Sequence, residues 1–127
     1  MKYARTVVLD GGFDEAVTKV KEAFKTQGFG TLTEIDVRAT LQEKLGIDRD
    51  PYLIIGACNP QLAHQALGAV PSVGVFLPCN VVVRVDGERI IVEAMDPDIM
   101  ASVIDDPALA EVAAEAASRV QAALDSL

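Results

Sequence analysis

The sequence has few of the residues that would assign it to a function class directly. Its 127 residues contain no tryptophan, two cysteines and only 5% aromatic residues. So few aromatic side chains argue against a surface that stacks nucleic-acid bases. The 19 acidic and 11 basic residues give a net charge of −8, which argues against attraction to a phosphate backbone. We therefore expect no nucleic-acid partner, and two cysteines are too few for a disulfide-built mini-protein.

Long apolar runs are also missing. No stretch approaches the roughly 20 consecutive apolar residues of a membrane-spanning helix. The basic N-terminus, with Lys2 and Arg5, is followed by an apolar run shorter than the roughly 7–15 residues of a signal peptide. We therefore expect no membrane association and a cytoplasmic location with reduced cysteines. Half of the residues are hydrophobic and no linker interrupts them, which predicts a single α+β domain over residues 1–127.

Two long helices are predicted from apolar residues at helical spacing. The first covers residues 13–27 and ends before Gly28. The second covers residues 107–125, begins with the cap and proline pair Asp106-Pro107, and carries an alanine-rich apolar stripe. Because each helix has one apolar stripe, both are expected to cover a sheet.

Two short helices are predicted as insertions between strands. Asp36 is the expected N-cap of the first, whose side chains at Val37, Leu41 and Leu45 are expected to face inward. The second follows Asn59-Pro60, an N-cap followed by proline at the first helical position.

Five strands are predicted from apolar alternation and from short apolar runs between turn signals. The last two form a hairpin, for which Asp86-Gly87 predicts a type I′ turn. Without the short helices, the order of elements is strand, helix, four strands, helix. The predicted strands cover residues 2–9, 30–36, 52–57, 80–85 and 88–94.

Four ordered segments resemble a known family, the domain-of-unknown-function family 302. They are GFGTLTEID from Gly28, IGACNPQLAH from Ile55, LPCNVVV from Leu77 and AMDP from Ala94. The resemblance extends over nearly the whole chain. It implies a compact α+β domain in which a long C-terminal helix grips an antiparallel sheet, and it implies a homodimer. The family has no agreed activity, so the resemblance implies a fold and no reaction.

The sharpest chemical feature is Cys58, which directly precedes the predicted helix at Asn59-Pro60. The positive end of a helix dipole lowers a thiol pKa and favours a nucleophilic or metal-binding thiolate. The alternative is a buried cysteine that acts as a small hydrophobic residue. Cys79 also lies at a strand end, and the spacing of 21 residues matches no zinc motif. A redox pair, a soft-metal site and two unrelated core residues all remain open.

His64, the only histidine, falls on the polar side of its predicted helix. It is interpreted either as an exposed residue without a role or as a proton carrier or metal ligand beside Cys58. Glu34 and Asp36 point to one face of their strand, where two carboxylates can hold a cation or share a proton. N-capping is the alternative role for Asp36, and it is also the alternative for Asp96.

These residues support three functional hypotheses. In the first, a non-catalytic binding or scaffold domain holds a small molecule in an apolar pocket, with Cys58, Cys79, Glu34 and Asp96 near its mouth. Asp36 and Asn80, which neighbour these positions in sequence, are further candidate ligand contacts. In the second, Cys58 and Cys79 perform thiol redox chemistry with His64 as the base. In the third, Cys58, His64 and Cys79 bind a metal; no catalytic residue or cofactor is identified.

Overall fold

A five-stranded sheet forms the body of the computed structural model, which describes residues 2–127. Every pair of neighbouring strands is antiparallel, in the order β1-β5-β4-β3-β2. The predicted strands and the implied antiparallel sheet are thereby confirmed. The strands are β1 (Ala4–Leu9), β2 (Gly30–Asp36), β3 (Tyr52–Cys58), β4 (Cys79–Asp86) and β5 (Arg89–Met95).

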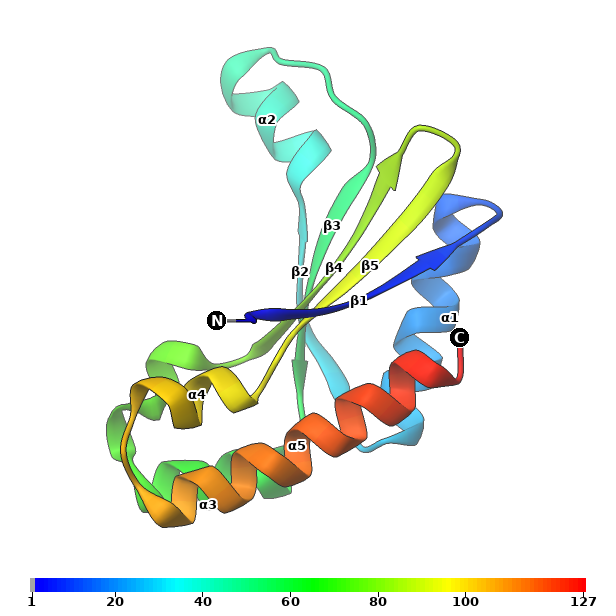
Figure 1. Cartoon of the computed structure of the whole chain (residues 1–127). Coiled ribbons are helices and arrows are strands. Elements are labelled where there is room, and N and C mark those ends of the chain that lie inside the picture. The colour runs from blue at the N-terminus through cyan, green and yellow to red at the C-terminus, as the bar shows by residue number, and fades with distance from the viewer. Residues whose placement is uncertain (1) are drawn as a thin grey trace.

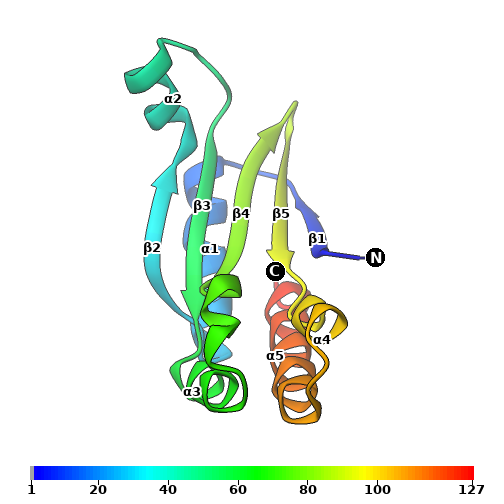
Figure 2. The same cartoon turned by 90° about the vertical axis from the view of Figure 1, so that its left-hand side faces the viewer.

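Helices cover one face and one end of this sheet. Figures 1 and 2 show α1 against one face, and α5 running across the end of the sheet beside α3 and α4. Within residues 2–127, no helix is long and apolar enough to cross a membrane. The helices are α1 (Phe13–Thr26), α2 (Val37–Leu45), α3 (Pro60–Ala69), α4 (Asp98–Val103) and α5 (Pro107–Asp125), with a 3₁₀ segment η1 (Pro71–Phe76).

The larger hydrophobic cluster, here called the sheet core, lies between the sheet and its covering helices. Strand residues such as Val83 and Val92 pack there against Val20 of α1 and Val120 of α5. The apolar stripes predicted for the two long helices are therefore the surfaces that they bury. Alanine at positions such as Ala123 of α5 leaves space for a close approach to the sheet.

A second hydrophobic cluster, here called the end cluster, lies beyond the carboxyl end of β5. It combines residues of α3, η1, α4 and the first half of α5. Its buried members are Ala66, Val73, Met100, Leu109 and Ala113. Because Leu109 and Ala113 belong to the end cluster and Val120 to the sheet core, α5 joins the two.

The predicted inward orientation of α2 is wrong. Of the described residues of α2, none is buried: Val37 and Leu41 are partly covered, and Leu45 is 65% exposed. The helix forms as predicted, with Asp36 at its N-cap and a left-handed Gly46 at its end. It stands away from α1 and α5 (Figure 1), so its apolar stripe packs against neither long helix.

The hairpin between β4 and β5 also differs from its prediction. Asp86 pairs with Arg89, so the two turn residues are Gly87 and Glu88 rather than Asp86 and Gly87. Gly87 has a φ of +62°, and among the described residues only glycines have positive φ. A type I′ turn needs positive φ at both central positions, whereas type II′ needs it only at the first. The glycine therefore selects a type II′ turn.

The second face of the sheet is here called the open face. By strand register, it carries Tyr52 and Ile54 from β3, Val82 from β4, and Glu93 and Met95 from β5. Figure 2 looks onto this face, with α1 behind the sheet. A groove of about 350 Å³ runs over it from Tyr52 towards the end cluster. Among the described elements, no helix packs across its centre.

Candidate functional site

Cys58 is the last residue of β3, and it directly precedes the N-cap of α3. The Asn59 side-chain oxygen accepts a hydrogen bond from the Leu62 N–H at 3.2 Å, and Pro60 occupies the first helical position. The predicted cap is therefore formed. This cap fixes the direction in which α3 leaves the strand, and it places Cys58 beside the positive end of the helix.

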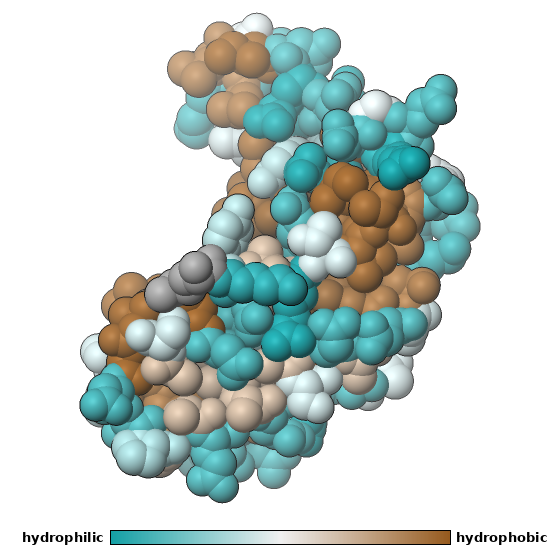
Figure 3. Space-filling model, in the orientation of Figure 1, coloured by the Kyte–Doolittle hydropathy of each residue, from teal (hydrophilic) through white to brown (hydrophobic). Residues whose placement is uncertain are grey.

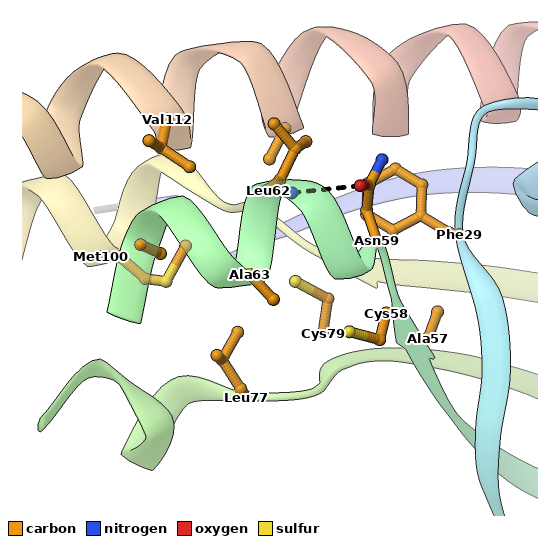
Figure 4. A pocket seen from close by; sticks show the side chains of 12 residues that line it. Phe29, Ala57, Cys58, Asn59, Leu62, Ala63, Leu77, Cys79, Met100 and Val112 are labelled. Atoms are coloured by element: carbon orange, nitrogen blue, oxygen red, sulfur yellow. Dashed lines mark hydrogen bonds between the residues drawn. The ribbon is translucent and has the colours of Figure 1, made fainter. Parts of the chain in front are cut away.

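Cys79 is the first residue of β4, where it pairs with Ala57 of the neighbouring strand. Since Cys58 follows Ala57 directly, the antiparallel register brings the two cysteines to the same end of the sheet. Both thiols are free. Figure 4 shows the two side chains next to each other, with both sulfur atoms directed towards the region beneath α3.

The two cysteines line one small hollow between the end of the sheet and helices α3 and α5. Its volume is about 30 Å³, which is room for about two water molecules. Most of the lining is apolar and many of the side chains are small, which is why space remains between the elements. The other lining residues are Phe29, Ala57, Asn59, Leu62, Ala63, Ala66, Leu77, Met100, Val112 and Ala116.

The environment of the two thiols keeps both of them protonated at neutral pH. Burial raises the pKa of Cys58 above its ordinary value. Burial, and then the nearby Cys58 thiol, raise the pKa of Cys79 to about 11. Loss of solvation disfavours the thiolate. Of the two interpretations of Cys58, the lowered pKa is therefore wrong, and the raised pKa agrees with a cysteine that acts as a small hydrophobic residue.

His64 does not join the two cysteines. It lies on the exposed side of α3 and is not part of the lining of the hollow. Within residues 2–127, no three side chains of His, Cys, Asp or Glu gather closely enough to hold a metal ion. The predicted set of Cys58, His64 and Cys79 is therefore not assembled as a metal site in this structure.

The acidic candidates on β2 have other contacts. Glu34 forms an ion pair with Lys21 of α1. This ion pair links the edge strand β2 to α1. Asp36 accepts a hydrogen bond from the Ala39 N–H at 2.9 Å and caps α2. Neither carboxylate lines the hollow.

Asp96 is a structural carboxylate at the start of α4. It is 6% exposed, accepts a hydrogen bond from the Asp98 N–H at 3.0 Å, and lies 3.2 Å from Nε of Arg5. Asp96 therefore contacts the first turn of α4 as a cap would, although the N-cap position itself is Pro97, and its ion pair to Arg5 also joins this turn to β1. Asn80 is exposed on the open face, in the groove over the sheet rather than in the hollow.

Several residues of the hollow were not identified from the sequence. Met100 and Phe29 come from segments that are distant from both cysteines along the chain, and Leu77 lies two residues before Cys79 but carries no chemical signal of its own. Their local patterns predict only ordinary apolar contacts. The useful signal was the pair of cysteines at strand boundaries, because the end of one strand lies beside the start of its antiparallel neighbour.

The fold and the sequence motifs agree with one known family. The model of the family described as "Domain of unknown function DUF302" matches residues 5–127. The crystal structure of an uncharacterized conserved DUF302 protein from Bacillus stearothermophilus is similar, with a TM-score of 0.90, 36% identity and 98% of each chain covered. No protein of curated function is similar enough to count as a relative. The chain therefore belongs to the DUF302 family, as its four segments indicated.

Proposed function

We propose that the protein is a non-catalytic binding domain whose site is the hollow lined by Cys58 and Cys79. The observation that carries the proposal is the position of this hollow at the seam between the sheet core and the end cluster. Ala57 and Phe29 of its lining belong to the sheet core, and Met100 belongs to the end cluster. Pockets commonly form where separately packed units meet.

The lining allows the hollow to enlarge. Met100 and Leu77 are two of its longer side chains, and the unbranched methionine changes rotamer at little cost. The alanines at positions 57, 63, 66 and 116 contribute little bulk. A small ligand therefore needs side-chain rotation rather than unfolding of either cluster.

The protonated thiols favour binding over thiol catalysis. A nucleophilic or redox-active cysteine reacts as the thiolate. The raised pKa of Cys79, about 11, leaves very little thiolate at pH 7. His64, the only side chain expected to act as a base, lies outside the hollow. A cytoplasmic location, where the environment is reducing, keeps both thiols free and is part of this proposal.

Xenon tests the binding role, because it enters apolar cavities without needing a specific polar contact. We expect xenon dissolved under pressure to shift the methyl NMR signals of Leu62, Ala63 and Leu77. Ala63→Leu should fill the hollow and abolish these shifts, while the exposed Ala110→Leu on α5 should leave them unchanged. Shifts that are absent from the wild-type protein, or that survive Ala63→Leu, would contradict the proposal.

We also propose that two copies of the chain pair through the open face and α2. An apolar helix stripe without a partner favours an interface, and Leu45 and Ile47 remain exposed at one end of this face. Val75 of η1 is 86% exposed near the other end. Figure 3 shows exposed hydrophobic surface both on the α2 segment and beside the end cluster.

One local charge supports a second copy as the occupant. The α2 segment carries charges of both signs, but the exposed Lys44 lies directly beside Leu45, whereas residues 90–118 contain seven acidic residues and no basic ones. A two-fold axis across the strands places α2 of each copy against the acidic end of the other.

Sedimentation equilibrium at micromolar concentration should give twice the 13.5 kDa of one chain. Leu45→Lys should shift the mass towards one chain, and Thr18→Lys on α1, behind the sheet, should not; a wild-type monomer would refute pairing.

A further inference from the structure

The hollow has the size and the donors of an ion site. Its volume of about 30 Å³ is closer to a dehydrated ion than to an organic metabolite. The Cys58 and Cys79 side chains point to the same side and lie next to each other in Figure 4. Both are free, and both contribute to the same lining. Two thiols therefore line one small, largely apolar space, whose lining also includes the thioether side chain of Met100.

The donor set selects the class of cation. Calcium and magnesium require several oxygen ligands, and no carboxylate lines the hollow. A closed zinc site requires four nitrogen, sulfur or oxygen ligands, and the hollow provides two thiols without a histidine. Thiolates prefer soft metals, and copper(I) and silver(I) are stable with only two sulfur ligands. The small number of donors therefore fits a soft monovalent cation.

From this geometry we infer that the hollow binds one soft monovalent cation, of the copper(I) or silver(I) class, between Sγ of Cys58 and Sγ of Cys79. The inference rests on the proposed binding role of the hollow, and it names the ligand. Both thiols are protonated in the metal-free protein, and the metal ligand is the thiolate, so the cation must displace both protons. Binding therefore breaks two S–H bonds, forms two metal–sulfur bonds and releases two protons to solvent. The metal stays monovalent, so no oxidant or reductant is consumed.

The surroundings suit the resulting complex. One monovalent cation between two thiolates carries a single negative charge, which the apolar lining alone would disfavour. The ten-residue helix α3 begins two residues after Cys58, so the positive end of its dipole lies beside this charge. The N-terminus of α3 therefore stabilises the negative charge of the complex between the two sulfur atoms. His64 has no part in the site because it lies outside the lining of the hollow.

Silver(I) is the preferred probe because it does not change oxidation state in air. The reduced, metal-free full chain is titrated with silver ions and examined by native mass spectrometry and by competition with a soluble thiol. We expect one tightly bound ion per chain. Cys58→Ser and Cys79→Ser should each weaken binding at least about 100-fold. His64→Gln, which removes the chain's only imidazole, should leave the affinity unchanged.

Several outcomes would overturn the inference. They are no binding, two independent ions per chain, or wild-type affinity after either serine substitution. If the serine variants do not fold, Ala63→Leu provides the test, because it fills the hollow while keeping both thiols. Its affinity for silver should fall at least about 10-fold, and an unchanged affinity would count against the site. Xenon entry without silver binding would reject the cation and keep the binding role, whereas failure of both probes would reject both.

Discussion

The sheet core and the end cluster both pack against α5, but they differ in how their partners are connected. The sheet core joins strands whose backbones are held by continuous hydrogen-bonded ladders. The end cluster joins short helices: α3 and α4 each pack on α5, and α3 also packs on η1. Regions with fewer long-range contacts open locally at a lower free energy. We therefore expect the end cluster to open as a unit before the sheet core.

This difference explains why the candidate site lies where it does. Large side chains from the sheet and from its covering helices fill the sheet core. An empty hollow there would lose packing contacts and would therefore be unfavourable. At the seam, by contrast, the sheet core contributes the small side chain of Ala57 and the end cluster contributes that of Ala66. Val112 and Ala116 of α5 also line the hollow. The space is therefore a result of two clusters that meet without interlocking.

Truncation in each cluster gives the largest expected effects. Leu124→Ala in the sheet core and Leu109→Ala in the end cluster remove fully buried side chains, so each should lower the free energy of global unfolding by about 3 kcal/mol. Only Leu109→Ala should also lower the protection of α3 amides against hydrogen exchange. Denaturant titration measures the first effect and exchange the second. Equal loss of α3 protection in both variants would show that the clusters open as one unit.

Two glycines test the contact that links α1 to the start of α3. Gly28 and Gly46 both have positive φ, +86° and +65°. A Cβ at Gly28 would lie 2.8 Å from Nδ2 of Asn59, whereas a Cβ at Gly46 would meet nothing within 4 Å. Gly46→Ala should therefore cost about 1 kcal/mol of backbone strain. Gly28→Ala should cost about 2 kcal/mol, because it also disturbs the Asn59 cap. Equal costs would contradict this link.

The pH dependence of stability sharpens the description of the hollow. An unfolded Cys79 titrates near 9.0 and the folded one near 11, so the unfolded chain loses its proton first as the pH rises. The thiol therefore favours the folded state below pH 9, and this contribution is lost between pH 9 and pH 11. Cys79→Ala should reduce the fall in stability over this range. Thermal unfolding at several pH values measures this fall in stability. An identical fall in the variant would show that the thiol is not buried.

The smallest effect is expected at the exposed helix α2. Leu45→Ala should change the free energy of unfolding of the monomer by less than about 0.5 kcal/mol, because the side chain is 65% exposed. Measurements at low and high protein concentration separate monomer stability from pairing. A loss above about 1 kcal/mol in the dilute monomer would mean that α2 packs on its own chain.

Local signals predicted the elements of this fold well. Asp106 followed by proline predicted the start of α5, and the Asp106 carboxylate accepts a hydrogen bond from the Leu109 N–H at 2.9 Å. Caps act within one helical turn, so three or four residues contain the necessary information. The predicted cap at Asn59 is formed for the same reason.

Contacts between residues that are distant in the sequence could not be predicted in this way. The stripe containing Leu41 and Leu45 predicts which side of α2 is apolar, but it does not say whether the chain provides a partner. Glu34 looked available for chemistry because Lys21, its partner, lies on another element. Likewise, Met100 reaches the hollow only because α4 packs beside α5 at the same end of the sheet as α3, which no local pattern records.

Amide hydrogen exchange tests the seam between the two clusters most directly. If the end cluster opens separately, amides of α3 and α4 exchange at a lower opening free energy than amides of β3 and β4, and bound silver protects α3 most strongly. If all of these amides exchange with one common free energy, with or without silver, the two clusters form one cooperative unit. The hollow would then not lie between separately opening units, and the observation that carries its proposed binding role would be lost.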